Sequence, residues 1–291
     1  MSEQVPFSTE SLVIVGPGLL GTSVALGLRK RGFTGRITGV GRRAETLSQA
    51  EETGGYDALT TDLAGTIAGA SVVLIAVPLS GFRAVFEQIA AHGQPGLIVT
   101  DVGSTKASVI ADARAHLSDL SRVIGAHPMA GAETSGPSGA DADLFVDRPC
   151  VLTVADSDDP EAIRVVESLW KGLGMRLLRM SPQEHDEQVA VVSHMPHLAS
   201  VMLMMVAEQQ GGLGVASSGF RDTTRLASSN PPMRADILDA NRPSIRKALA
   251  AFRVACDEMD RLLESGDRHA ITRVLERVRN ARQDWLDSAE K

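Results

Sequence analysis

The feature that most constrains the fold is a short apolar run followed at once by a glycine-rich loop. Residues Ser11–Val15 read Ser-Leu-Val-Ile-Val, and Gly16-Pro17-Gly18-Leu19-Leu20-Gly21 follows directly. A β-branched run that ends in glycine is typical of a buried parallel strand. The next segment, 22–31, is predicted to form a helix that Gly32 ends. Strand, glycine loop and helix in this order predict the first unit of an open α/β sheet.

The same alternation continues through the first half of the chain. Repeated strands and helices with short connections predict a doubly wound, mostly parallel sheet with helices on both faces, a Rossmann domain, over residues 1–182. The predicted strands are 36–40, 71–77, 97–102, 122–126 and 150–154, and the predicted helices are 45–53, 82–92 and 106–117.

After about residue 182 the pattern becomes purely helical. Residues 184–210 have helical periodicity, and a glycine-rich stretch then interrupts it. Pro243 is placed to open a helix ending at Ser265, and Asp267 is placed to cap a last one. We therefore expect an all-α second domain over residues 183–291.

The amino-acid composition excludes several classes of binding partner. The chain of 291 residues has a net charge of −7 and only 3% aromatic residues, which argues against a nucleic-acid-binding protein. We find no secretory leader pattern at the N-terminus and no apolar stretch that reaches the length of a bilayer span. The two cysteines, Cys150 and Cys256, match no metal-site spacing and suit a reducing compartment. We expect a soluble, cytoplasmic protein that binds no membrane, nucleic acid or metal.

The glycine loop matches the G-x-G-x-x-G pattern of dinucleotide-binding proteins. Gly16 permits the tight turn, Gly18 lets the backbone approach a pyrophosphate, and Gly21 allows the helix to pack closely on the strand. The helix N-terminus then offers free N–H groups and a positive dipole end to the phosphates. A purely structural turn is the alternative interpretation.

The residues that distinguish NAD from NADP are expected about 20 residues further on, at the end of the second strand. An enzyme that uses NAD usually has Asp or Glu there, whereas this chain has Gly41-Arg42-Arg43. Two guanidinium groups suit the 2′-phosphate of NADP, although a solvated pair of arginines that opens a helix would look the same. NADP is favoured and NAD stays open. The predicted cofactor-binding residues are Gly16, Gly18, Leu19, Leu20, Gly21, Arg42, Arg43 and Val77.

Two further segments follow predicted strands, and so lie at the sheet edge where such folds bind ligands. One is Asp101–Lys106, which contains Ser104, and the other is Ala126–Gly131, which contains His127. A histidine suits a general base because its pKa lies near neutrality. The alternatives are a structural histidine and a Ser104 or Thr105 that merely caps the next helix.

In the helical half, His194 and His197 are three residues apart and would share one helix face. We do not expect them to bind a metal, because no Asp, Glu or Cys stands at ligand spacing. Arg221 and Arg225 are candidates for binding a carboxylate, or else form a surface salt-bridge cluster.

Five segments together resemble the prephenate/arogenate dehydrogenases of tyrosine biosynthesis. The resemblance runs from about Leu12 to the last helix, and it implies a Rossmann domain, a helical domain that forms a homodimer, and an active site between them. The segments, in chain order, are GPGLLGTSVALGL (16–28), DVGSTK (101–106), AHPMAG (126–131), SHMPH (193–197) and FRDTTRLA (220–227).

The resemblance also implies a reaction, the oxidative decarboxylation of prephenate to 4-hydroxyphenylpyruvate with hydride transfer to NAD(P)+. It implies that His127 is the base on the ring hydroxyl and that Ser104 hydrogen-bonds the same group. By the same resemblance Arg225 pairs with a substrate carboxylate, His197 contacts the side-chain end of the substrate, and His194 is a neighbouring residue. The presence of His197 favours prephenate, while arogenate, mixed cyclohexadienyl and 4-amino-4-deoxyprephenate activities stay open.

Two other interpretations are weighed. A β-hydroxyacid dehydrogenase would need a catalytic lysine in the helical half, where Lys247 is the candidate. A non-catalytic NADP-sensing regulator would keep the glycine loop but would not need His127, Ser104 and Arg225 together. The chain shows no C-terminal regulatory domain, so we do not expect tyrosine feedback through one.

Overall fold

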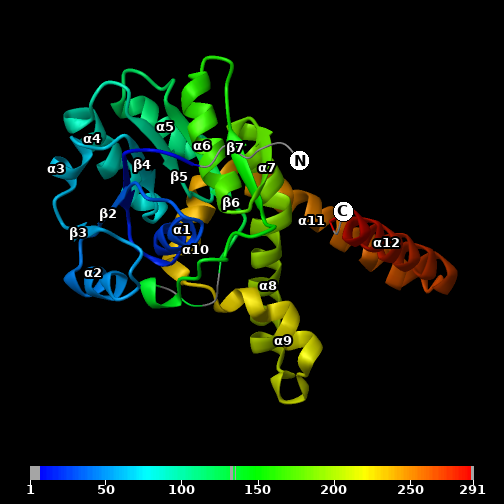
Figure 1. The fold of residues 1–291 in the computed structure, drawn as a ribbon. Helices are drawn as coiled ribbons and strands as arrows, with labels where there is room; N and C mark the ends of the chain where they lie inside the picture. Colours follow the sequence, from blue (N-terminus) through cyan, green and yellow to red (C-terminus); the bar gives the residue numbers. More distant parts are fainter. Residues whose placement is uncertain (1–6, 132–133, 135, 290–291) are drawn as a thin grey trace. The chain divides into compact units, whose positions relative to one another are not determined.

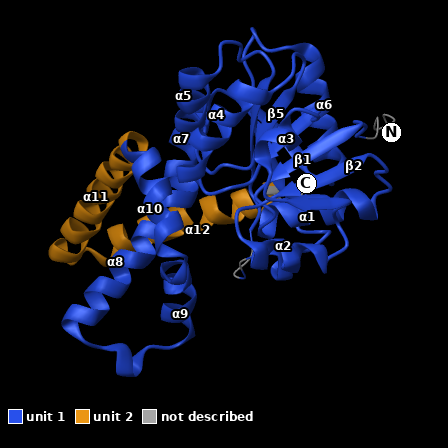
Figure 2. Cartoon of the chain, turned by 90° about the vertical axis from the view of Figure 1, so that its left-hand side faces the viewer, with its two compact units in different colours: residues 1–242 blue, residues 243–291 orange. Residues whose placement is uncertain are grey.

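The computed structural model describes residues 7–131, 134 and 136–289. It divides into two compact units, residues 1–242 and residues 243–291 (Figure 2). The N-terminal segment 1–6, which bears on the expectation of no leader, lies outside the described residues.

Unit 1 is built on an eight-stranded sheet of order β3-β2-β1-β4-β5-β6-β7-β8 (Figure 1). All neighbouring strands pair in parallel except β6 and β7, so the prediction of a doubly wound, mostly parallel sheet is confirmed. The direction of winding reverses between β1 and β4, which is where such sheets bind their ligands. The strands are β1 (Ser11–Val15), β2 (Arg36–Val40), β3 (Ala58–Thr60), β4 (Val72–Ile75), β5 (Ile98–Asp101), β6 (Val123–Pro128), β7 (Pro149–Thr153) and β8 (Arg176–Met180).

Helices cover the sheet, and four elements of this part escape the sequence patterns. Two of them, β3 and α3, have three and five residues, too few to show a period. The strand β8 is an edge strand with mostly exposed side chains, whereas α6 has clear start signals, with Asp159 as its cap and Pro160 in the first turn. The helices are α1 (Leu19–Lys30), α2 (Ala44–Glu51), α3 (Leu63–Ile67), α4 (Phe82–His92), α5 (Ala107–His116) and α6 (Pro160–Gly172).

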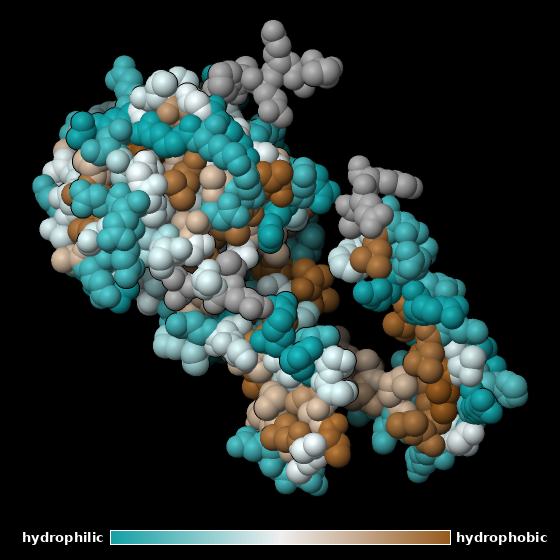
Figure 3. All heavy atoms as spheres, turned by 60° about the horizontal axis from the view of Figure 1, so that its bottom comes forward, coloured by the Kyte–Doolittle hydropathy of each residue, from teal (hydrophilic) through white to brown (hydrophobic). Residues whose placement is uncertain are grey.

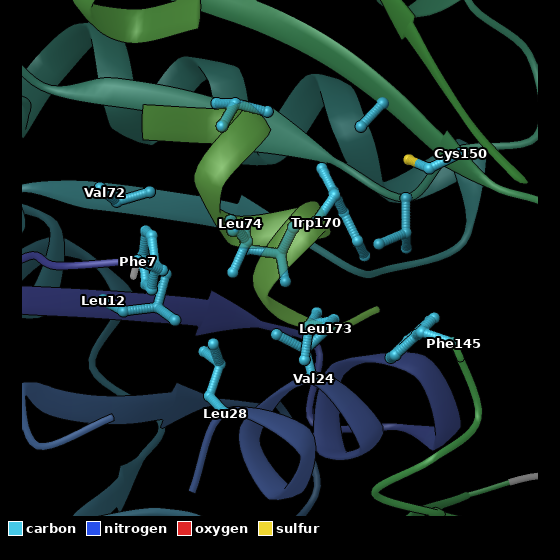
Figure 4. Close-up of a cluster of buried hydrophobic side chains, with 14 of the residues drawn as sticks. Phe7, Leu12, Val24, Leu28, Val72, Leu74, Phe145, Cys150, Trp170 and Leu173 are labelled. Atoms are coloured by element: carbon cyan, nitrogen blue, oxygen red, sulfur yellow. The ribbon is translucent and has the colours of Figure 1, made fainter. Parts of the chain in front are cut away.

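The core has one layer on each face of the sheet. Along β1, Leu12 and Ile14 pack into one cluster, while the alternate residues Val13 and Val15 pack into the other. The first cluster also contains Trp170 of α6 and helix α1 residues (Figure 4). Burial on both faces explains why these strands read as continuous apolar runs.

After the sheet, the chain forms one long helical run with a break in its hydrogen-bond pattern. It consists of α7 (Pro182–Val189), a π-helical turn (Ala190–His194) and α8 (Met195–Gln210). Pro196 lacks an N–H group, so a regular α-helix could not complete its hydrogen bonds there. A π turn accommodates such an interruption and is frequent at functional sites.

This run of 29 residues, Pro182–Gln210, is the one helix among the described residues that is long and apolar enough to cross a membrane by length and composition. The expectation that no stretch reaches that length is therefore wrong for this helix. The run also contains buried polar side chains, those of His185, Asp186, His194 and His197. No charged residue interrupts residues 189–207, but His194, Pro196 and His197 break the apolar pattern, so its length was missed in the sequence.

The remaining helices follow in pairs. In unit 1 these are α9 (Ser218–Thr224), a 3₁₀ turn (Arg225–Ser228) and α10 (Pro231–Ala240), and unit 2 contains α11 (Arg242–Ser265) and α12 (Arg268–Ala289). The two predicted last helices are confirmed, and Asp267 accepts a hydrogen bond from Ala270 N at 2.9 Å, as a cap does. The predicted domain boundary at 182/183 falls where the strands end, whereas the compact units meet at 242/243.

Apolar side chains reach the surface of the helical segments (Figure 3). Isolated exposed apolar residues are ordinary, but long helices that expose them repeatedly are typical of association surfaces. In unit 1 they include Val191, Val192, Leu203, Met205 and Val206, and in unit 2 they include Val254, Leu263, Leu275, Val278 and Trp285.

Candidate active site

The glycine loop has the geometry that a dinucleotide site requires. Gly16 has φ +100°, and a Cβ there would lie 2.6 Å from the carbonyl oxygen of Ala76. A Cβ on Gly21 would lie 2.4 Å from the carbonyl oxygen of Gly16, so the helix can approach the strand only without a side chain. Above Gly18 there is open space, with nothing within 4 Å. Glycine thus serves a different purpose at each of the three positions, and the open space at Gly18 leaves room for a phosphate.

The other predicted cofactor residues lie around this loop. Leu19 and Leu20 form the first turn of α1, and Val77 follows β4 with its backbone against Gly16. Arg42 and Arg43 are exposed between β2 and α2. The preceding Gly41 packs on Pro17 of the loop, so the arginines emerge beside the predicted phosphate site.

His127 lies near the carboxyl end of β6 and begins a buried hydrogen-bonded triad. Its Nδ1 lies 2.8 Å from Nε2 of His185, and Nδ1 of His185 lies 2.7 Å from Oδ1 of Asp186. The two imidazole rings meet edge to face, with centroids 5.0 Å apart. Both partners come from α7, so the triad joins the sheet to the first helix of the helical run.

The hydrogen bonds of the triad determine which nitrogen of each ring carries the hydrogen. A carboxylate only accepts, so His185 must donate from Nδ1 to Asp186. With its one ring hydrogen on Nδ1, His185 accepts at Nε2, and His127 donates to it from Nδ1. This leaves Nε2 of His127 with a free lone pair, which is the form that a general base needs.

Asp186 also caps helix α5. Its Oδ1 accepts from Lys106 N at 2.8 Å and its Oδ2 from Ala107 N at 3.0 Å. The alternative that Ser104 or Thr105 caps this helix is therefore not what the structure has, and the Thr105 hydroxyl instead bonds that of Ser108 at 2.7 Å. Ser104 lies half-buried in the loop between β5 and α5.

Beneath this loop lies a buried ion pair of Lys106 and Asp101. The strand β6 leaves β5 after residue 124, and these two side chains take up the backbone groups that lose their ladder partners. Asp101 accepts from Ala126 N at 3.2 Å, and Lys106 donates to Ala126 O at 2.7 Å. The pair therefore holds the backbone of the residue before His127.

A second group of polar side chains lies on the helices. His194 Nε2, His197 Nδ1 and Arg234 Nε are buried and have no hydrogen-bond partner among the described residues. Asn241 connects this group to the triad, since its Nδ2 donates to Asp186 O at 2.7 Å and lies 3.3 Å from His194 Nδ1. Helices α7, α8 and α10 thus converge on one polar interior.

Burial favours the uncharged form of His127, His194 and His197. It lowers the pKa of His127 well below its ordinary value, and the nearby His185, Lys106 and His194 lower the pKa further. Burial likewise lowers the pKa of His194 to about 4, and burial and the charge of Arg234 lower that of His197. Neutral imidazoles can accept protons, so the site is arranged for base chemistry.

Arg225 begins the 3₁₀ turn after α9 and is exposed. This turn is held against α8, because Ala227 N donates to Ser200 Oγ at 3.0 Å. Arg221, the other predicted carboxylate ligand, is 80% exposed and lies beside Asp222. Among the described residues, no group of three or more His, Cys, Asp or Glu side chains is arranged to hold a metal ion.

Sequence reasoning missed four residues of this site: His185, Asp186, Asn241 and Arg234. A His-Asp pair, a lone Arg or an Asn at a helix end has no distinctive pattern, because the importance of these residues comes from what the tertiary fold places beside them. The one usable signal was position, since His185 and Asp186 open the same helical run that contains the predicted His194 and His197.

Comparison with known families identifies this arrangement. Residues 24–179 match the nucleotide-binding domain of prephenate dehydrogenase, and residues 181–277 match the dimerisation domain of the same family. The chain belongs to the prephenate dehydrogenase family. Membership confirms the predicted family and the enzyme class, an NAD(P)-dependent dehydrogenase.

Individual relatives agree along most of the chain. Prephenate dehydrogenase of Bacillus subtilis strain 168 is 31% identical over 97% of this chain and 77% of its own. The crystal structure of A. aeolicus prephenate dehydrogenase in complex with hydroxyphenyl propionate and NAD+ superposes with a TM-score of 0.90 at 29% identity, covering 95% of this chain and 98% of that one. Synechocystis arogenate dehydrogenase superposes with a TM-score of 0.81 at 31% identity, covering 94% and 99%.

Proposed function

We propose that this protein, as a prephenate dehydrogenase, oxidatively decarboxylates prephenate to 4-hydroxyphenylpyruvate, with His127 as the general base. The observation that supports this role most is the triad of His127, His185 and Asp186, which leaves Nε2 of His127 free to accept a proton. A merely structural histidine would have no need of a partner that selects one ring tautomer.

In the proposed reaction, His127 Nε2 takes the proton of the ring hydroxyl, and the hydrogen on the same carbon leaves as hydride. The bond to the ring carboxylate then breaks, CO2 departs, and its electron pair passes through the ring to the oxygen. His127 returns the proton to that oxygen, and the aromatic product results. Ser104 would hydrogen-bond the same hydroxyl, and Arg225 would pair with the ring carboxylate.

The cofactor that these residues suit is NAD(P)+, which would supply the hydride acceptor. The glycine loop would hold its pyrophosphate, with the open space over Gly18 facing it. We propose NADP as the preferred form because Arg42 and Arg43 are exposed beside the loop and no carboxylate stands between β2 and α2.

Replacing Arg42 and Arg43 together by alanine is expected to weaken NADP binding while sparing NAD. Each charge-assisted hydrogen bond to a phosphate contributes about 1.5–3 kcal/mol, so the loss should be about tenfold or more in KM for NADP. The measurement is the initial rate with each cofactor at saturating prephenate. Equal KM values for NADP in the variant and the wild type would contradict the preference.

Replacing His185 by phenylalanine is expected to lower kcat by about 10- to 100-fold. Without an acceptor at this position, the ring hydrogen of His127 is no longer held on Nδ1, so Nε2 is less often free to accept a proton. In His185→Gln a side-chain oxygen can still accept from His127, so we expect it to retain more activity. Both variants should bind the cofactor as the wild type does, by fluorescence titration. Equal kcat values for the two variants would argue for a role in packing alone.

A second candidate substrate is arogenate, which the similarity to Synechocystis arogenate dehydrogenase supports. The deciding experiment is a matrix of prephenate and arogenate against NAD and NADP, following the reduced nicotinamide. A protein that reduces neither cofactor with either substrate would overturn the proposed function.

The assembly and location we propose are a homodimer in the cytoplasm, without membrane attachment. The match of residues 181–277 to a dimerisation domain and the exposed apolar side chains of the helices support the dimer. Sedimentation equilibrium measures it directly.

A further inference from the structure

Arg234 is a charged group that the fold partly desolvates, and no salt bridge to it is found within residues 7–131, 134 and 136–289. It lies in the first turn of α10 and is half-buried. Across the described parts of the chain its hydrogen-bond partner is the Ser229 hydroxyl, 3.4 Å from Nη2, and its Nε has none. Burial lowers the pKa of the guanidinium accordingly. A desolvated cation for which the described residues provide no acidic partner is unfavourable for stability, which points to a ligand that supplies the opposite charge.

Two buried histidine atoms also have no hydrogen-bond partner among the described residues. Nε2 of His194 and Nδ1 of His197 are buried without partners, and the charge of Arg234 lowers the pKa of both rings. Buried polar atoms in native structures are normally hydrogen-bonded. Unsatisfied atoms on Arg234 and on two histidines that its charge affects therefore favour a binding site for a polar anion in this part of the fold.

The helix that contains Arg234 is also fixed to the catalytic group. Asn241, at the end of α10, donates to the backbone of Asp186 and contacts His194. Arg234 is thus held in a defined position relative to the triad by the same helix.

The chemistry of the group suits a 2-oxo acid. A guanidinium binds a carboxylate through two parallel hydrogen bonds, and a neutral imidazole can donate one N–H to a ketone oxygen. In prephenate the ring hydroxyl lies across the ring from the carbon that bears the side chain. With His127 on the hydroxyl, the side-chain carboxylate and ketone reach a site at the opposite end of the substrate.

We propose that Arg234, together with His197, binds the 2-oxo-carboxylate end of the substrate and discriminates against the 2-amino analogue. This rests on the proposed function. The discrimination has a simple electrostatic origin, because the ammonium group of arogenate would lie beside a desolvated positive charge, whereas the ketone of prephenate would accept a hydrogen bond there.

The test compares Arg234→Gln and Arg234→Lys with a control, Arg179→Gln. Arg179 is an exposed arginine on β8 that pairs with Glu167, and removing such a pair has little effect. We expect Arg234→Gln to lower kcat/KM for prephenate by about 30- to 100-fold, mainly through KM, because a charge-assisted hydrogen bond is lost. The ratio of kcat/KM for prephenate over arogenate should fall by about tenfold in Arg234→Gln and less in Arg234→Lys.

Two readouts separate binding from a structural role. The melting temperature of Arg234→Gln should equal or exceed that of the wild type, because an unpaired desolvated charge has been removed. Calorimetric titration with hydroxyphenyl propionate and NAD+ tests the carboxylate contact at the side-chain end, because the single carboxylate of this ligand is on its side chain. Its binding should weaken in Arg234→Gln and stay unchanged in Arg179→Gln.

Unchanged hydroxyphenyl propionate binding, or an equal loss with both substrates together with a lower melting temperature, would overturn the role of Arg234. A wild-type protein that oxidises neither prephenate nor arogenate would instead overturn the proposed function.

Discussion

Replacing His127 by asparagine is expected to lower kcat by about 10²- to 10⁴-fold, the usual contribution of a general base. The amide of asparagine can still donate to Nε2 of His185, so the hydrogen bond of the triad at 2.8 Å has a substitute and the fold should persist. What the variant lacks is the lone pair at Nε2. Steady-state kinetics with prephenate and a fluorescence titration of the cofactor measure the two effects separately.

The pH profile of the wild type tests the same role. Because burial and nearby positive groups lower the pKa of His127 well below its ordinary value, the residue is neutral and basic at neutral pH. The logarithm of kcat/KM should therefore stay constant as the pH falls through 6.5. It should decline only at lower pH, where His127 becomes protonated. Stability should decline in the same direction, since the unfolded state binds protons on its histidines first.

Two outcomes would contradict this assignment. One is an equal loss of cofactor binding and turnover in His127→Asn, which would indicate damage to the fold. The other is an acidic limb centred at the ordinary histidine pKa in the wild type, which would indicate an exposed group as the base.

Replacing Lys106 by methionine is expected to lower the free energy of unfolding by about 3–5 kcal/mol, the usual result of breaking a buried ion pair. The side chain of Lys106 is fully buried beside Asp101. Its removal leaves a buried carboxylate without its cation and the carbonyl oxygen of Ala126 without its donor, 2.7 Å away in the wild type. Denaturant unfolding followed by circular dichroism measures the change.

The matched control is Lys171→Met, since Lys171 is half-exposed and pairs with Glu167 one helical turn away. Its effect should stay within about 0.5 kcal/mol, as is usual for surface substitutions. If both variants lost the same stability, the buried pair would not have the structural role described above.

Much of the fold follows from local sequence. The strands at 11–15 and 36–40 and the helix at 82–92 have the predicted bounds, because a β-branched apolar run or a strong amphipathic period needs no distant contact to be recognised. Three of the elements that escaped, β3, α3 and β8, are short or lie at the sheet edge, where half-exposed residues show no clear period, whereas α6 has recognisable start signals and was overlooked. The roles of the three loop glycines also follow from spacing, because each depends on backbone conformation within a few residues.

The site was predictable only in part. His127, Ser104, His194 and His197 were proposed because they sit in recognisable segments or after strands, and their roles stay predictions. The sequence by itself determined the α/β order and the dinucleotide loop, since these depend on short-range patterns. Only the tertiary structure decided that Asp186 caps α5 while orienting His127 through His185, and that Asn241 joins Asp186 to His194, because such contacts join residues up to 80 positions apart.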